Sequence, residues 1–120
     1  MDRTESQENY IETIHMLSQK KPVVRAVDIA NELGFKKPSV SIAMKSLREQ
    51  ELITVTPEGY IYLTDEGLSI AQKIYERHLV LTKALINLGI SADTAEADAC
   101  RVEHVISEET FRAIKKLVKS

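Results

Sequence analysis

The spacing of the apolar residues changes from helical to strand-like near residue 52, and this change constrains the fold more than any other feature. Before it, apolar residues recur at helical spacing in residues 5–19, in residues 26–33 and in a third segment that begins near Pro38. Residues 52–63 instead hold two short β-branched or aromatic runs around the turn signal Thr56-Pro57-Glu58-Gly59. The pattern predicts three helices followed by a β-hairpin.

Helical spacing returns after the hairpin. Thr64 is a suitable N-cap for a long helix that Gly89 ends. Ser91 is expected to cap a further helix that runs through Cys100 and His104 to about Ile106. Ser107-Glu108-Glu109 has the composition of a last helix start. The chain is thus expected to be mainly α with a small β-hairpin.

Helix, short helix, tight turn, helix and hairpin is the element order of a winged helix-turn-helix. In that arrangement the third helix enters the major groove of DNA and the hairpin lies along the flanking backbone. Small hydroxyl side chains near the start of the third helix allow a close approach to bases and phosphates. Alternatively, these serines only cap and solvate the helix.

Charge is unevenly distributed. The chain as a whole has a formal net charge of −2, but residues 20–50 carry seven basic side chains against three acidic ones. A basic segment in an acidic chain is typical of a DNA-binding surface, although such runs also occur as solvated faces. The residues expected to contact phosphates or to lie near bases are Lys36, Lys37, Ser39, Ser41, Lys45 and Arg48.

Composition narrows the class of protein. Of the 120 residues, 43% are hydrophobic and 28% charged, as in ordinary globular domains. No apolar run approaches the roughly 20 residues of a membrane span, and the polar first residues lack the apolar core of a signal peptide. A single cysteine forms no internal disulfide, in keeping with a reducing compartment. We therefore expect a cytoplasmic protein with no membrane partner.

The one cysteine stands in the segment Asp98-Ala-Cys-Arg-Val-Glu-His-Val-Ile-Ser107. Glu103 and His104 follow Cys100 by three and four residues, so on a helix all three would share one face. Sulfur, oxygen and nitrogen ligands together suit Fe(II), Zn(II), Co(II) or Ni(II) better than Mg or Ca. The spacing predicts a transition-metal site.

The chain resembles the diphtheria toxin repressor family of metal-dependent transcriptional repressors, including its manganese-sensing branch. The resemblance runs from about Glu8 to Leu117 and is most specific in Asn9–Ile14, in Arg77-His78 and in Asp98–Ser107. It implies a winged helix-turn-helix in residues 1–64 and a helical metal-binding and dimerisation domain in residues 65–120. Some members carry a further SH3-like domain, and this chain is expected to be a short form without it.

The resemblance also implies a set of metal ligands. Cys100, Glu103 and His104 match the triplet of the iron sensors, and Glu12 matches a ligand of the manganese type. Asn9 stands at a ligand position that is Met in the iron type and Asp in the manganese type. The implied ligands are Cys100, Glu103, His104, His78, Glu12, Asn9 and Glu96, where Glu96 replaces a His of the iron type and Thr82 replaces a Glu.

The function that follows is a homodimeric repressor that binds a palindromic operator in double-stranded DNA when Fe(II) or Mn(II) is bound. Zn(II), Co(II) or Ni(II) would serve in vitro, and no enzymatic activity is expected. One alternative is a winged-helix regulator that is independent of metal or controlled by another ligand. The others are a small metal hydrolase with a Cys/Glu/His site and a metal-storage or interaction module.

Overall fold

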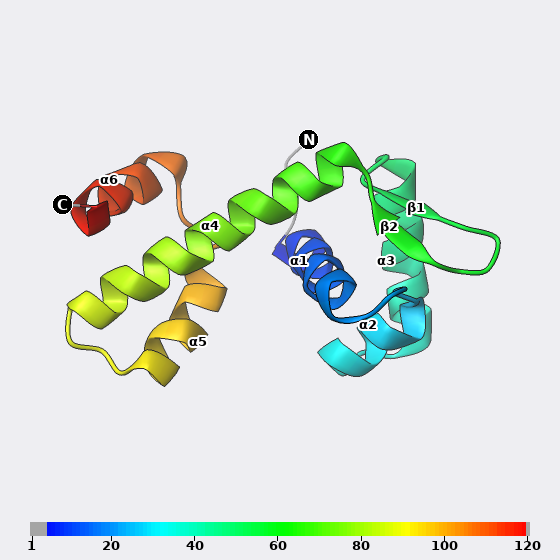
Figure 1. Ribbon diagram of the computed structural model, residues 1–120, viewed down its shortest axis with the longest axis horizontal. Helices are drawn as coiled ribbons and strands as arrows, with labels where there is room; N and C mark the ends of the chain where they lie inside the picture. Colours follow the sequence, from blue (N-terminus) through cyan, green and yellow to red (C-terminus); the bar gives the residue numbers. More distant parts are fainter. Residues whose placement is uncertain (1–4, 120) are drawn as a thin grey trace. The chain divides into compact units, whose positions relative to one another are not determined.

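The computed structural model describes residues 5–119, and Figure 1 shows the helices and the hairpin. The expected architecture, mainly α with one small hairpin and a winged helix-turn-helix order, is confirmed. The elements in chain order are α1 (Glu5–Lys20), α2 (Ala26–Leu33), α3 (Lys37–Glu49), β1 (Ile53–Val55), β2 (Ile61–Leu63), α4 (Asp65–Asn87), α5 (Ala92–Val102) and α6 (Glu108–Lys119).

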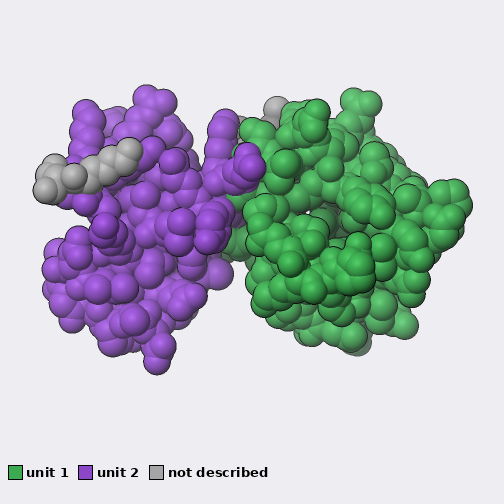
Figure 2. Space-filling view, viewed as in Figure 1, with its two compact units in different colours: residues 1–71 green, residues 72–120 purple. Residues whose placement is uncertain are grey.

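Two compact units make up the chain, residues 1–71 and residues 72–120 (Figure 2). We call them unit 1 and unit 2. The boundary falls inside α4, so the first turns of this helix belong to unit 1 and the remainder to unit 2.

Unit 1 has a continuous apolar core beneath its first three helices. Each helix places a stripe of apolar residues on one side at helical spacing, and the side chains of this stripe are buried. The turn from α2 to α3 is made by Gly34, whose φ of 70° lies in the left-handed region that favours glycine. Fully buried side chains of this core include Ile11, Ile14, Ile29, Val40 and Leu47.

The hairpin is a two-stranded antiparallel sheet in the register Ile53↔Leu63, Thr54↔Tyr62 and Val55↔Ile61. Its two strands alternate between a buried face, which carries Ile53 and Ile61, and an exposed face. The Ile61 amide also donates to the Val24 carbonyl oxygen at 2.8 Å. The hairpin is therefore attached to the segment that precedes α2.

The junction between hairpin and α4 is tight. Thr64 caps α4 as predicted, since its Oγ1 accepts from the Gly67 amide at 3.1 Å. The same hydroxyl donates to the Glu51 carbonyl oxygen at 2.8 Å. Glu51, where the chain leaves α3, has a φ of 62° although it is not a glycine. Gly67 faces the Leu52 carbonyl, which a Cβ at residue 67 would strike.

Unit 2 contains the rest of α4 together with α5 and α6. The predicted caps are confirmed, because the Ser91 Oγ accepts from the Thr94 amide at 3.4 Å and the Ser107 Oγ accepts from the Thr110 amide at 3.1 Å. Few apolar side chains of this unit are buried, and several large ones are exposed on it. The buried ones are Ile74, Leu81, Ala95, Ala99 and Phe111.

The prediction that the helix after Ser91 reaches Ile106 is wrong, because α5 ends at Val102. The carbonyl oxygens of Glu103 and Ile106 accept hydrogen bonds from the Arg77 guanidinium at 3.2 and 2.9 Å. The Val105 amide donates to the Val102 carbonyl oxygen at 3.0 Å, a three-residue spacing that tightens the last turn. Residues 103–106 thus form a turn between α5 and α6.

None of the helices within residues 5–119 has both the length and the apolar character that a bilayer span requires.

Candidate functional site

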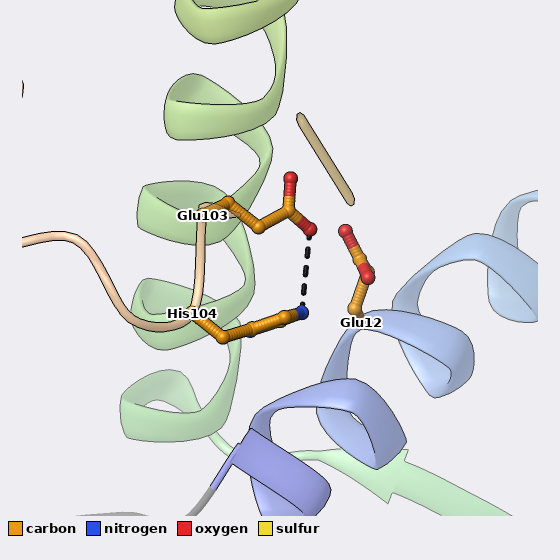
Figure 3. Close-up of side chains that lie close together, drawn as sticks. All are labelled: Glu12, Glu103 and His104. Carbon is orange, nitrogen blue, oxygen red and sulfur yellow. Dashed lines mark ion pairs between the residues drawn. The ribbon is translucent and has the colours of Figure 1, made fainter. Parts of the chain in front are cut away.

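A buried carboxylate lies at the centre of unit 2. Glu103 follows the last residue of α5, and its side chain is 0% exposed. Its Oε2 lies 2.9 Å from Nδ1 of His78 on α4, and its Oε1 lies 3.4 Å from Nε2 of His104. Figure 3 shows Glu103 and His104 with this ion pair. Each oxygen of one buried carboxylate thus faces an imidazole nitrogen.

This arrangement suits a transition metal by the chemistry of its donors. A buried carboxylate is costly unless charged or hydrogen-bonding groups compensate it, and here Nδ1 of His78 is within hydrogen-bonding distance of one oxygen and Nε2 of His104 lies 3.4 Å from the other. Imidazole nitrogen and carboxylate oxygen are donors that Mn(II), Fe(II) and Zn(II) accept in proteins. Because Glu103 is held in a turn and His78 in a helix, the donors come from two different elements.

Glu96 and Cys100 lie on α5, before this turn. An oxygen of the exposed Glu96 side chain is 4.0 Å from Nε2 of His78. Cys100 is exposed, whereas Glu103 is buried. The expectation that Cys100, Glu103 and His104 share one helix is not met, because Glu103 and His104 come after the end of α5. The structure brings His78, Glu103 and His104 together, with Glu96 beside His78.

The two remaining predicted ligands, Asn9 and Glu12, belong to unit 1. Both lie on α1 and both are half-buried. The backbone carbonyl oxygen of Asn9 accepts from Oγ1 of Thr13 at 2.8 Å. Their spacing of three residues places them on the same side of α1.

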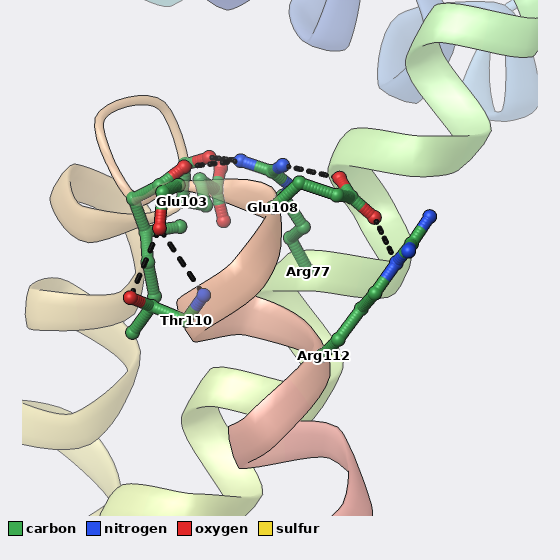
Figure 4. Close-up of polar contacts among 7 residues, drawn as sticks. Arg77, Glu103, Glu108, Thr110 and Arg112 are labelled. Atoms are coloured by element: carbon green, nitrogen blue, oxygen red, sulfur yellow. Dashed lines mark hydrogen bonds and ion pairs between the residues drawn. The ribbon is translucent and has the colours of Figure 1, made fainter.

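Arg77 holds the turn that carries Glu103 and His104 (Figure 4). Besides its bonds to the Glu103 and Ile106 carbonyl oxygens, it donates to Oε2 of Glu108 at 2.9 Å. Its guanidinium also lies over the ring of Phe111, 5.3 Å from the centroid. Sequence reasoning used Arg77 only as part of a motif and missed this role. Its position directly before His78 was the available signal.

The Arg77 side chain also affects Glu108, the first residue of α6. Its guanidinium donates to this carboxylate and holds the pKa of Glu108 below its usual range, with a smaller contribution from Arg112. An acidic residue at this position also favours the positive end of the α6 dipole.

The predicted DNA-contacting residues lie on α3 and at its start, and all are exposed. Lys36 is the N-cap of α3, Lys37 is its first residue and Pro38 lies in its first turn, where a missing amide hydrogen costs nothing. A groove of about 220 Å³ runs between α3 and the hairpin and is lined by Ser41, Lys45 and Arg48 among others. The exposed residues are Lys36, Lys37, Ser39, Ser41, Lys45 and Arg48.

The start of α2 is bound to the hairpin by a further basic residue. The Arg25 guanidinium lies 5.0 Å from the centroid of the Tyr60 ring and donates to the Tyr60 hydroxyl at 3.2 Å. This contact, together with the Ile61–Val24 hydrogen bond, supports the hairpin beside the groove.

Two known domain families together match nearly the whole chain. Residues 2–61 match the iron dependent repressor N-terminal DNA binding domain, and residues 64–120 match the iron dependent repressor metal binding and dimerisation domain.

Among curated relatives, the transcriptional regulator MntR of Escherichia coli O157:H7 is 37% identical over 113 residues, which are 94% of this chain and 73% of that protein. The iron-dependent repressor IdeR of Mycobacterium tuberculosis (strain H37Rv) is 27% identical over 114 residues, 94% of this chain and 50% of that protein.

Among solved structures, a manganese-dependent transcriptional repressor in complex with manganese is 25% identical, with a TM-score of 0.86 over 94% of this chain and 52% of that one. The manganese regulator SloR is also 25% identical, with a TM-score of 0.81 over 99% of this chain and 55% of that one. The chain therefore spans about half the length of these solved proteins.

Proposed function

The chain belongs to the iron-dependent repressor family, and we propose that it is a dimeric repressor whose operator binding is activated by Fe(II) or Mn(II). Members of this family are metal-dependent transcriptional repressors, so the resemblance stated from the sequence is confirmed. The two domain matches support DNA as one partner and a second copy of the chain as the other.

We further propose which residues hold the metal. The observation that carries this proposal is the buried Glu103 carboxylate between His78 and His104, in the domain that matches the family's metal-binding part. Cys100 and Glu96 on α5 would complete the set from unit 2, and Asn9 and Glu12 on α1 would add donors from the DNA-binding part. The proposed ligands are Cys100, Glu103, His104, His78, Glu12, Asn9 and Glu96.

A bound divalent cation supplies positive charge among these donors. The residues of the chain position the donors: Arg77 fixes the backbone at Glu103 and Ile106, and α4 presents His78. Because Glu12 belongs to the DNA-binding part, ligation by it would favour one arrangement of the dimer over others. Two recognition helices must match half-sites about one DNA turn, or a multiple of it, apart.

For the DNA-binding part we propose residues 1–64, and for the metal-binding and dimerisation part residues 65–120, with the boundary at the start of α4. Lys36, Lys37, Lys45 and Arg48 would contact phosphates, and Ser39 and Ser41 would lie near bases, because all six are exposed on or at α3. Support comes from the family match to residues 2–61.

We also propose a cytoplasmic location and no enzymatic activity. The single cysteine agrees with a reducing compartment, and the named relatives are regulators rather than enzymes.

DNA binding titrated separately with Mn(II), Fe(II), Co(II) and Zn(II) tests the proposal. The probe is a duplex selected from a random pool with the Mn(II)-loaded chain, and a chelator serves as the metal-free arm. We expect metal to raise the affinity and the chelator to abolish the increase. Equal binding with and without chelator would favour the metal-independent alternative.

Two variants make the ligand assignment specific. His104→Ala should lose the metal response while circular dichroism shows the helices intact. His15→Ala is the matched control, because His15 is a half-buried histidine of α1 that belongs to none of the proposed ligands. A His104→Ala protein that responds fully to Mn(II) and Fe(II) would refute the assignment.

The phosphate contacts are tested by the salt dependence of binding. Each phosphate contact contributes about 0.9 to the slope of log affinity against log salt. Lys37→Ala should therefore weaken binding to all sequences and reduce this slope by about one. An unchanged slope would remove Lys37 from the interface.

A further inference from the structure

Ile42 is an apolar side chain with no place in the core. It lies in the middle of α3 and is 73% exposed, more than any other large hydrophobic residue that the structure describes in unit 1. The next values in that unit are 46% for Tyr62 and 45% for Phe35. Single exposed apolar residues are common on protein surfaces, but Ile42 lies in the middle of the helix that carries the predicted DNA-contacting residues.

Folding does not account for isoleucine at this position. The buried stripe of α3 is formed by Val40, Met44 and Leu47. Ile42 is two residues from both Val40 and Met44, which places it about 200° around the helix from each. A β-branched residue is also a weaker helix former than Ala, Lys or Gln. An exposed Ile42 thus adds nothing to the stability of unit 1.

The face around Ile42 is polar and basic. Ser39 lies three residues before it and Lys45 three residues after it, so both share its side of the helix. Lys37 and Arg48 are exposed at the two ends of the same helix. A second copy of this surface would be repelled by its like charges, whereas the phosphates of a duplex are attracted to it.

The major groove offers this side chain an apolar partner. Among the base edges exposed there, the C5 methyl of thymine is the apolar group, and proteins read it by contact with aliphatic side chains. The neighbours of Ile42 are suited to phosphates and polar edges, and Ile42 itself is suited to a methyl group.

We propose that Ile42 is a specificity-determining residue that contacts a thymine methyl group in the major groove. The operator would then carry a thymine at the base pair that faces the middle of α3. This inference rests on the proposed function, since it requires α3 to be the recognition helix of a DNA-binding dimer.

Replacing thymidine by deoxyuridine tests the proposal, because it removes the methyl group and leaves base pairing unchanged. The probe is the duplex selected with the Mn(II)-loaded full chain, resynthesised with deoxyuridine at one thymidine position at a time. In the unmodified protein we expect at least one replacement to weaken binding about fourfold, since burying one methyl-sized group is worth about 0.8 kcal/mol.

Two variants assign the effect to the side chain. Ile42→Ala should bind the thymidine and deoxyuridine duplexes with equal affinity. Lys45→Ala is the matched control on the same face: it should weaken binding to both duplexes and keep their ratio. Ile42 is exposed and Ala is the better helix former, so Ile42→Ala is expected to fold, which circular dichroism checks.

Two outcomes would overturn the inference alone. One is equal binding of the unmodified protein to every deoxyuridine duplex. The other is an Ile42→Ala protein that keeps the full thymidine preference, which would place the methyl contact elsewhere. Failure of the unmodified protein to bind any duplex in the presence of metal would instead refute the proposed function and this inference with it.

Discussion

Unit 1 and unit 2 differ in what fills their interiors. Unit 1 buries most of the apolar side chains that the structure describes as buried, and its predicted DNA-contacting residues are exposed on α3 or at its start. Unit 2 buries few apolar side chains, and its interior contains the carboxylate of Glu103 with His78 beside it. It also leaves Leu88, Val105 and Leu117 among the most exposed apolar residues.

This difference shows how each unit is stabilised. Apolar burial is the dominant favourable term in folding, so the buried apolar core is the main source of stability in unit 1. Unit 2 has less of it and relies on polar contacts such as those of Arg77. Its exposed apolar surface agrees with the match of residues 64–120 to a dimerisation domain, in which a second copy covers part of it.

The largest effect is expected from the core of unit 1. Leu47→Ala should lower the free energy of unfolding by about 2–5 kcal/mol, because it opens a cavity in a packed core. Ile42→Ala on the same helix is the matched control, since Ile42 is 73% exposed and Leu47 is 0% exposed. Urea unfolding of both variants decides the matter: equal losses would contradict the description of the core.

In unit 2 the corresponding change is Arg77→Ala. It leaves the carbonyl oxygens of Glu103 and Ile106 without their donor, which should cost about 1–3 kcal/mol in the metal-free protein. Amide hydrogen exchange over residues 103–107 should quicken at the same time.

The control for Arg77 is Arg112→Ala. Arg112 also pairs with Glu108, at 3.2 Å, but it is largely exposed and contacts neither carbonyl. Its removal should cost no more than about 0.5 kcal/mol. If both arginine variants were equally stable, the two carbonyl contacts would not hold the turn.

At the junction of the hairpin and α4, a Gly→Ala substitution should lower the stability of the protein, although the same substitution usually raises it. Gly→Ala inside an exposed helix normally stabilises by about 1 kcal/mol. Gly67→Ala should instead destabilise by about 1–3 kcal/mol, because the added Cβ meets the Leu52 carbonyl oxygen. Thermal unfolding measures the change, with exposed Ser69→Ala on the same helix as control. A more stable Gly67→Ala protein would show that the junction is looser than described.

The smallest effect concerns pH and the start of α2. The Arg25 amide donates to Asp28 at 2.9 Å and Lys21 pairs with it at 3.0 Å, and these contacts hold the pKa of Asp28 below its ordinary value of 3.8. The stabilisation is therefore present above pH 3.8 and is lost as pH falls through the lowered pKa.

Asp28→Asn should accordingly cost less than about 1 kcal/mol at pH 7, and the difference from the unmodified protein should shrink below about pH 4. Urea unfolding at pH 7 and pH 3 measures it. A difference that grows in acid would contradict the assignment.

Much of the fold was predictable because local signals agreed with packing. Thr64, Ser91 and Ser107 begin helices where their residue types predicted it. The end of α5 was not predictable in this way, since the signal for it is not local: Arg77 lies 26 residues before the Glu103 carbonyl that it binds.

The candidate site was predictable only in its residue types. Spacing and resemblance indicated Cys100, Glu103 and His104, yet they place all three on one helix, whereas Glu103 and His104 lie in the turn after α5. Which histidine faces which carboxylate oxygen depends on the packing of α4 against this turn. Ile42 was overlooked for another reason: the DNA-contacting residues were predicted from positive charge and small hydroxyl groups, and an exposed apolar side chain has neither.

The left-handed backbone of Glu51 shows that this fold is not at its limit of stability. A side chain with a Cβ pays roughly 1 kcal/mol to adopt that conformation, and asparagine tolerates it better. Glu51→Asn is thus expected to raise the melting temperature. It leaves the predicted DNA-contacting and metal-ligating residues unaltered. A melting temperature no higher than that of the unmodified chain would mean that the Glu51 carboxylate itself stabilises the fold and offsets the gain in backbone conformation.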